Sequence, residues 1–349
     1  LKNPSMVKIH DYFKRRYVPN NMAIVLAGDV DPDETMAMVE KYFGKFKKQE
    51  VVNPKMPVEK PITSPQIADV TGADAESEMV AFRLDGVGSQ DALYLELMNG
   101  VLSNGTAGLI DLNLNQSQKV LRARSSVTTN EDYSFLMLSA NNREGQSLKE
   151  VRELLLAQIE EVKKGAFDDW MIDAVVRSYK KDMMGQMEAN WIRAYLMSDA
   201  FILNEDWNDV VNRYDRMQKI TKDELVAWAN KKFKDNYVAV NKRQGEKNVE
   251  KVDKPEITQL TINRDESSKF FKEISAMSSK RLEPMFINYD NEIQKETIKG
   301  LVPMNYVQNT TNEIYNMYYV FEMGKKNDLM IPLAFKYLPY LGTDGMSPA

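Results

Sequence analysis

Regularly spaced apolar residues run along the whole chain and predict its secondary structure. Apolar positions at helical spacing predict helices over 6–17, 34–46, 89–103, 108–114, 148–164, 221–234 and 329–341. Shorter apolar or alternating runs predict strands over 22–27, 66–84 (with a turn at 72–74), 119–129, 133–140, 236–240, 301–307 and 314–321. Since long helices separate hairpin-like strand pairs, we predict an α+β fold whose mostly antiparallel sheet carries helices on one side.

Breaks and caps refine this pattern in the middle of the chain. Residues 167–216 are predicted to be helical, with breaks near 189–190 and 204–205. Thr221 stands three residues before Glu224, which is the signature of a capping box at a helix start. The middle of the chain is therefore predicted to be a row of consecutive helices.

Two segments depart from the regular pattern. Four prolines punctuate the polar stretch 48–65, which is typical of an extended linker. Residues 244–299 are rich in charges of both signs and show little alternation. We interpret both segments as linkers between folded parts.

Composition excludes several classes of protein. The chain has 349 residues, of which 43% are hydrophobic, enough for sizeable cores. Its net charge is −5 and it has no basic cluster, so no nucleic-acid partner is expected. No apolar run approaches the roughly 18 residues of a membrane span. The absence of cysteine excludes disulfides, thiolate nucleophiles and cysteine-based zinc sites.

The chain contains one histidine, His10, on the first predicted helix. It lies among Lys8, Asp11 and Lys14, with no marked nucleophile or ligand partner nearby, so a solvated surface side chain is the simpler interpretation. A zinc site built on a pair of histidines cannot form within this chain.

The stretch 16–44 carries the most specific motif. It reads as helix end, turn, apolar strand, turn and helix start, with Asp31 as the expected N-cap. Its residues are Arg-Tyr-Val-Pro-Asn-Asn-Met, an apolar strand, Gly-Asp-Val-Asp-Pro, and a helix ending in Tyr-Phe-Gly. This run resembles the M16 (insulinase, or pitrilysin-type) zinc peptidases, whose repeat carries Tyr-x-Pro-x-Asn-Met, an apolar strand and Gly-Asp-hydrophobic-Asp/Pro at this place.

The chain also matches itself. A strand ending at Gly86 stands 238 positions before one ending at Gly324, and the following helices end at Gly105 and Gly342, 237 positions apart. This order predicts an internal repeat, in which 314–343 superposes on 77–106.

The resemblance gives these parts an arrangement. It implies four repeats in two halves around a peptide-binding chamber, and it divides this chain into five parts. These are the C-terminal part of a first, catalytic-type repeat (1–47), a linker (48–65), a complete non-catalytic second repeat (66–243), an interdomain linker (244–299) and the start of a third repeat (300–349). Because the chain starts without methionine just before a helix, we expect a fragment or a mature product.

In the family, a His-x-x-Glu-His motif binds zinc with a downstream Glu, and the first His lies nine positions before the Gly of a Gly-Thr pair. Carried onto this chain, the His, Glu and His positions hold Glu96, Asn99 and Gly100 in one repeat. In the other repeat they hold Leu333, Lys336 and Tyr337. Neither set can build the site, since Leu333 is no ligand and Lys336 would repel the metal. We therefore predict no catalytic, metal-binding or cofactor-binding residue in this chain.

Two functions fit the resemblance. In the first, the chain is the non-catalytic middle of a zinc metalloendopeptidase and contributes chamber wall and hinge linker. Zinc would be bound outside this chain, and the chain by itself would be inactive. In the second, the parent is an inactive scaffold or binding protein, like the respiratory-complex core proteins or processing-peptidase partners. The expected partners are peptide or small-protein substrates, with a homodimer or a heteromeric M16 partner allowed by the family, and a bacterial periplasmic location is the family-based expectation.

Overall fold

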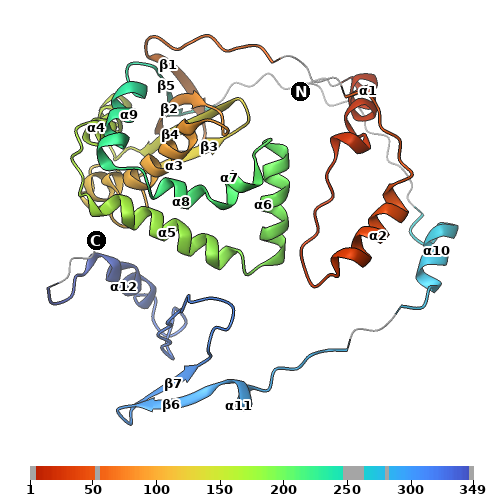
Figure 1. Ribbon diagram of the computed structural model, residues 1–349. Helices are drawn as coiled ribbons and strands as arrows, with labels where there is room; N and C mark the ends of the chain where they lie inside the picture. Colours follow the sequence, from red (N-terminus) through yellow and green to blue (C-terminus); the bar gives the residue numbers. More distant parts are fainter. Residues whose placement is uncertain (1–4, 52–55, 247–262, 280–282, 346–349) are drawn as a thin grey trace. The chain divides into compact units, whose positions relative to one another are not determined.

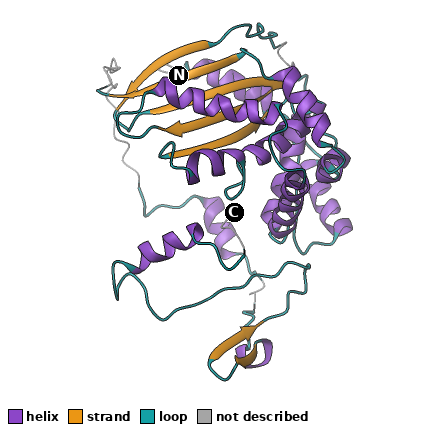
Figure 2. Ribbon diagram, turned by 90° about the vertical axis from the view of Figure 1, so that its left-hand side faces the viewer, coloured by secondary structure: helices purple, strands orange, loops and turns teal. Residues whose placement is uncertain are grey.

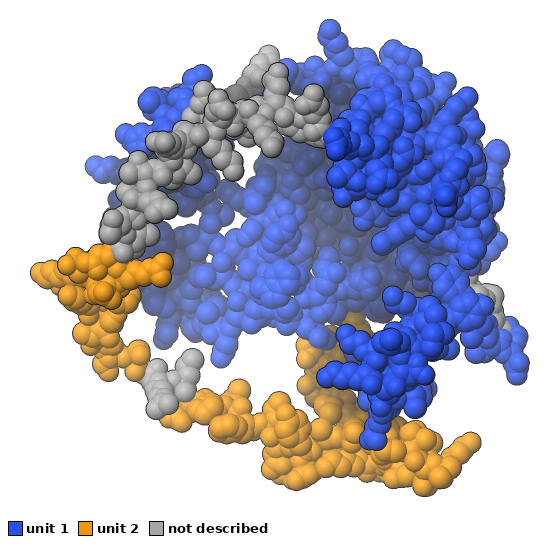
Figure 3. All heavy atoms as spheres, turned by 180° about the vertical axis from the view of Figure 1, so that it is seen from behind, with its two compact units in different colours: residues 1, 3–248, 317–349 blue, residues 2, 249–316 orange. Residues whose placement is uncertain are grey.

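The computed structural model describes residues 5–51, 56–246, 263–279 and 283–345. The predicted linkers therefore lie partly outside the described residues, at 52–55, 247–262 and 280–282. Its contacts divide the chain into two units, one of residues 3–248 with 317–349 and one of residues 249–316 (Figure 3). Each unit is described by itself below, and the five-part division of the chain stays a prediction.

A five-stranded sheet forms the centre of the larger unit (Figure 1). Its strands follow the spatial order β1-β5-β2-β4-β3, and only β1 and β5 run parallel. The strands are β1 (Gln66–Gly72), β2 (Ser77–Asp85), β3 (Arg122–Thr129), β4 (Tyr133–Asn141) and β5 (Tyr237–Gln244). The predicted α+β fold with a mostly antiparallel sheet is thereby confirmed.

Helices cover one face of this sheet (Figure 2). The two that contact it most are α3 (Gln90–Leu102) and α4 (Leu148–Lys163), because alternate residues of β2, including Val80, Phe82 and Leu84, are buried on that side. The other helical elements are the π-helix η2 (Asp111–Gln116), α5 (Trp170–Gln186), α6 (Asn190–Ile202), α7 (Trp207–Val211), α8 (Arg213–Met217) and α9 (Lys222–Lys232).

The predicted caps and breaks are present. The side chain of Thr221 accepts a hydrogen bond from the backbone N–H of Glu224, and the carboxylate of Glu224 accepts one from the backbone N–H of Thr221. Helix breaks lie at residues 187–189 and 203–206, as the sequence indicated. The predicted helix over 108–114 is in part a π-helix, displaced toward residue 116.

The second face of the sheet carries the intervening residues of each strand. Met79 and Ala81 of β2 lie there, next to Met137 on β4 and to Val238 and Val240 on β5. Met79 is 41% exposed, and the other four side chains are partly exposed. Among the described residues, no helix makes contacts with this face comparable to those of α3 and α4 on the other.

A buried polar cluster ties α4 to the helix-covered face. Nε of Arg152 on α4 lies 2.5 Å from Oε1 of Glu78 on β2, and Arg152 also donates to the side chain of Asn241 on β5. Asn241 in turn donates to Asp69 on the edge strand β1, at 3.1 Å. Since Glu78 is fully buried, its charge depends on Arg152 for compensation.

The N-terminal segment contains α1 (Met6–Arg16), a 3₁₀ turn η1 (Pro19–Asn21) and α2 (Pro32–Phe43), with Asp31 capping α2 as predicted. The prediction of a buried strand over 22–27 is wrong. Residues 22–27 pair with no strand in the described part of the chain, and Met22, Ile24 and Leu26 are about half exposed. A strand needs a neighbour for its backbone hydrogen bonds, and an apolar run alone does not provide one.

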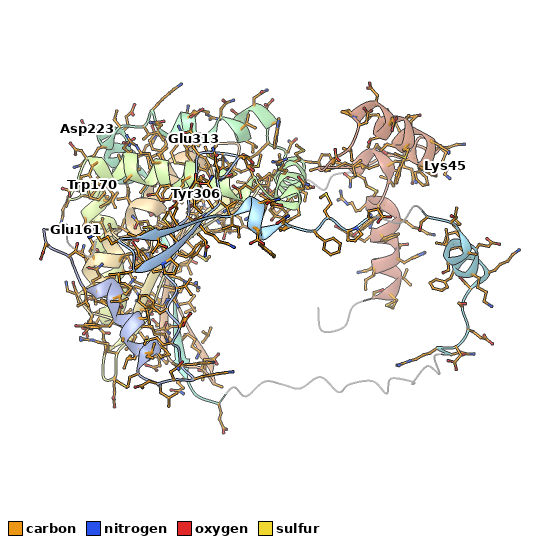
Figure 4. The ribbon with its side chains drawn as sticks, turned by 90° about the horizontal axis from the view of Figure 1, so that it is seen from below. Lys45, Glu161, Trp170, Asp223, Tyr306 and Glu313 are labelled. Atoms are coloured by element: carbon orange, nitrogen blue, oxygen red, sulfur yellow. The ribbon has the colours of Figure 1, made fainter. Side chains whose placement is uncertain are left out.

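The smaller unit holds α10 (Lys269–Ala276), α11 (Tyr289–Glu292) and the hairpin of β6 (Gln294–Ile298) and β7 (Val302–Tyr306). Tyr306 at the end of β7 is labelled in Figure 4. Lys299 and Gly300 both have positive φ, and the N–H of Leu301 donates to the carbonyl of Ile298. This is the turn that matches the twist of a two-stranded ribbon, and it confirms the strand predicted over 301–307.

The C-terminal segment contradicts the predicted internal repeat. Residues 314–321 form no strand, and Tyr315, Tyr318 and Tyr319 are more than three-quarters exposed. The helix predicted over 329–341 is shortened to α12 (Ile331–Tyr337), followed by the 3₁₀ turn η3 (Leu338–Tyr340). The segments that precede Gly86 and Gly324 therefore differ in secondary structure, because 77–85 is paired on both sides and 314–321 has no partner strand among the described residues.

Candidate functional site

The residues at the family's zinc positions lie together on α3. Glu96, Asn99 and Gly100 have the spacing i, i+3 and i+4, which places their side chains on one face of a helix. That face packs against α5 and α8. The structure thus places these three residues together where α3 contacts α5 and α8, and the side chains of those two helices determine what can bind there.

Gly100 lies where two helices come unusually close. A Cβ atom on Gly100 would lie 2.3 Å from Cγ1 of Val175 and 2.8 Å from the hydroxyl oxygen of Tyr179, both on α5. Both distances are below van der Waals contact, so a histidine cannot be placed here without displacing α5. The position of the second histidine ligand is therefore filled by the neighbouring helix.

Glu96 is held by a cation. Its Oε2 lies 3.9 Å from Nη1 of Arg213 on α8, and Nη2 of the same guanidinium lies 2.6 Å from Oε1 of Glu205. Burial raises the pKa of the Glu96 carboxyl, and Arg213 opposes this rise. A permanent positive charge beside the only carboxylate of the three residues disfavours a second cation.

Two tyrosines complete this environment. The rings of Tyr179 and Tyr214 lie 5.7 Å apart, and the hydroxyl of Tyr179 donates to the backbone carbonyl of Glu96 at 3.1 Å. Burial, with a smaller contribution from the charge of Glu96, raises the pKa of Tyr179 to about 12. The hydroxyl of Tyr179 therefore links α5 to the backbone of α3.

These residues do not fit a zinc ion. Zinc sites in proteins use about four nitrogen, sulfur or oxygen ligands in tetrahedral geometry, and this place offers one carboxylate already paired with arginine. Leu333, Lys336 and Tyr337 on α12 offer no better set, and all three side chains are exposed. Within the described ranges, no group of three or more His, Asp or Glu side chains is placed to hold a metal.

A cavity of about 240 Å³ adjoins Glu96 and is lined by further charged residues. Its acidic residues include Glu205 and Asp209, which form ion pairs with Arg213 and Arg216 respectively. The lining also includes Glu96 and Asp206, so four carboxylates face two arginines, and Arg213 is shared between Glu96 and Glu205.

A second cavity, of about 350 Å³, lies between the starts of α5 and α9. Trp170 and Asp223, near these helix starts, are labelled in Figure 4. Asp169 in its lining forms an ion pair of 2.8 Å with Lys222, so a charge-compensating contact already bridges the two helix starts.

The single histidine, His10, lies on α1, and its side chain is exposed.

Sequence reasoning found the three α3 positions and missed their partners. Val175, Tyr179 and Arg213 lie between 75 and 117 positions further along the chain. No spacing rule connects them to α3, because the contact depends on how α5 and α8 pack.

No helix in the described part of the chain has both the length and the apolar composition that a membrane crossing requires.

The comparisons with known proteins agree with this geometry. Residues 6–179 match the family model described as "Peptidase M16 inactive domain". The chain is 20% identical over 240 residues to the zinc protease PqqE of Helicobacter pylori (strain ATCC 700392 / 26695), a match that covers 67% of this chain and 54% of that protein. The chain therefore spans about half the length of this curated relative.

Two solved structures share the fold. The crystal structure of a protease from Helicobacter pylori superposes with a TM-score of 0.65 at 19% identity, covering 69% of this chain and 60% of that one. The periplasmic protease PqqL from Escherichia coli superposes with a TM-score of 0.55 at 15% identity, covering 69% of this chain and 28% of that one. The match of residues 6–179 to the family model confirms the sequence resemblance, and the chain belongs to the M16 peptidase family, whose inactive domain it carries.

Proposed function

We propose that this chain is the non-catalytic middle portion of an M16-type zinc metalloendopeptidase. In this proposal, residues 66–243 form a wall of the chamber that holds peptide substrates, and residues 244–299 connect the two halves as a hinge. Residues 1–47 complete the catalytic-type repeat, and residues 300–349 follow the hinge. Zinc is bound by the parent protein outside this chain.

One observation carries the proposal, namely the packing of α5 onto Gly100. Val175 and Tyr179 occupy the space of a histidine ligand, and the guanidinium of Arg213 lies 3.9 Å from the carboxylate of Glu96. A domain that keeps the family fold but fills its own metal position is suited to a structural role beside an active repeat. The match to a zinc protease over about half of that protein's length supports the same role.

Metal analysis and a peptide-cleavage assay test this proposal. We expect the 349-residue chain to bind no stoichiometric zinc and to cleave no peptide, and we expect the complete parent protein to do both in a chelator-sensitive way. Stoichiometric zinc with chelator-sensitive cleavage by the chain alone would contradict the proposal. Inactivity of the parent as well would favour the second function, an inactive scaffold or binding protein of the same family.

The location is part of the proposal. Similarity to a periplasmic protease of Escherichia coli supports a periplasmic parent protein. Cell fractionation of the source organism, with detection of the parent by antibody, checks this directly. Recovery in the cytoplasmic fraction would remove the location while leaving the structural role untouched.

A further inference from the structure

The face of the sheet that carries Met79 and Ala81 is covered by no helix in the described residues, and we call it the uncovered face. The strand register arranges its residues in rows. In the first row Arg122 on β3, Asn141 on β4, Ser77 on β2 and Lys242 on β5 are consecutive cross-strand neighbours. In the next row Arg124 stands at the β3 end, followed by Ser139, Met79 and Val240. Neighbouring strands lie about 4.8 Å apart, so each row crosses the sheet over roughly 14 Å.

The centre of this face is apolar. Behind the two rows just described, Met137, Ala81 and Val238 form a third row, and Phe135 follows on β4. These side chains are partly exposed, and their neighbour Met79 is 41% exposed. An uncovered apolar sheet face of this kind is characteristic of a surface that binds another polypeptide.

Three cations on this face have no acidic partner in the described residues, whereas Arg83, opposite Phe135, forms an ion pair of 3.8 Å with Glu59. Among the described residues, no carboxylate forms an ion pair with Arg122, Arg124 or Lys242. Arg124 donates to the hydroxyl of Ser139, and Lys242 donates to backbone carbonyls, including that of Ala75 at 2.9 Å. These contacts orient the side chains but leave their positive charges uncompensated.

In the part of the chain that the structure describes, two carboxylates border this face besides Glu59, the partner of Arg83. Glu76, in the turn before β2, accepts a hydrogen bond from Asn142, and Asp85 at the far end of β2 pairs with Lys232. The chain as a whole carries a net charge of −5, so a cationic end on this face is opposite in sign to the rest of the molecule. Such a local reversal of charge favours an acidic partner.

We propose that the uncovered face of the sheet binds extended peptide segments in which apolar residues are followed by a cluster of acidic residues. The apolar residues lie on Met79, Met137 and Val240, and the acidic cluster lies at the row that contains Arg122 and Lys242. This inference rests on the proposed chamber-wall function and adds to it the class of peptide that the wall selects.

Three fluorescent peptides of equal length test the inference on the intact chain. All share one apolar half, and the other half carries glutamates, glutamines or lysines. We expect the glutamate peptide to bind about tenfold more tightly than the glutamine peptide at low salt, with the lysine peptide weakest. Raising the salt concentration should reduce this preference, because the cations are exposed to solvent.

The double variant Arg122→Glu with Arg124→Glu should abolish the preference for glutamate. A matched control, Lys149→Glu with Arg177→Glu, makes the same change in net charge at exposed positions on α4 and α5 and should keep the preference. Circular dichroism and thermal unfolding of each variant confirm that the fold is intact, and the salt dependence of the unmodified chain gives a second, independent measurement.

The outcomes separate the two proposals. Equal binding of all three peptides, or equal loss of preference in the control, would overturn the inference and leave the chamber wall in place. If no peptide binds at all, both the inference and the peptide-holding role of this wall are overturned.

Discussion

A Cβ atom on Gly100 would lie 2.3 Å from Cγ1 of Val175, so the position of a family zinc ligand is occupied by the side chain of another helix. This relationship has a direct consequence for attempts to restore a metal site. At this position the chain has neither the ligand residue nor the space for it, so replacing the residue alone cannot create the site.

We predict that Gly100→His destabilises the chain by about 1–3 kcal/mol without creating a zinc site, because the imidazole would overpack α3 against α5. Urea unfolding measures the loss, and metal analysis measures zinc. Gln90→His, at the exposed start of the same helix, serves as the control and should leave stability nearly unchanged. Unchanged stability of Gly100→His would show that α5 moves aside at little cost.

The buried pair of Glu78 and Arg152 gives a second prediction. Arg152→Met should cost about 3–5 kcal/mol, since it leaves the fully buried Glu78 without its cation. The double change Glu78→Leu with Arg152→Met should recover a large part of that loss, because it removes both charges. Urea unfolding of the two variants, with exposed Lys149→Met as control, decides the matter. If the double variant is less stable than Arg152→Met, the polar cluster stabilises the fold in another way.

Tyr179 leads us to expect an alkaline loss of stability. Its pKa lies at about 12 in the folded chain and near 10.0 when the residue is exposed in the unfolded chain. Between these values the folded state holds a proton that the unfolded state has released, so stability is complete below pH 10 and falls as the pH rises toward 12. Tyr179→Phe should flatten this part of the stability–pH profile, whereas Tyr195→Phe at an exposed position should not. Identical profiles for both variants would count against this assignment.

The capping box at the start of α9 supplies a fourth prediction. Thr221→Ala should lower the free energy of unfolding by about 1 kcal/mol, because the backbone N–H of Glu224 loses its acceptor. Thr221→Ser keeps a hydroxyl and should retain most of the stability. Thermal unfolding of the three proteins provides the comparison, and equal loss in both variants would point to the methyl group of Thr221 instead of the hydrogen bond.

The sequence predicted most of the central unit because local signals there agree with tertiary packing. Alternating apolar residues gave the strand pairs, the Thr221 and Glu224 pair gave the start of α9, and the breaks near 189 and 204 were placed correctly. Each of these features depends on neighbours within a few positions along the chain, which is the range over which sequence patterns carry information.

The strand predictions failed where a partner strand was required and none followed from the pattern. Residues 22–27 and 314–321 have apolar character like that of β2, yet β2 pairs with both β4 and β5, and these two segments pair with no strand in the described residues. Apolar content makes a strand favourable only when backbone hydrogen bonds are also satisfied. The predicted internal repeat failed for the same reason.

The sequence by itself showed that Glu96, Asn99 and Gly100 supply one carboxylate and neither histidine of the family's zinc motif. Only the tertiary structure decided what replaced the metal, because Val175 and Arg213 reach α3 from helices far along the chain. The same holds for the uncovered face of the sheet. The register that places Arg122 and Lys242 in one row depends on pairing across four strands, which no local pattern specifies.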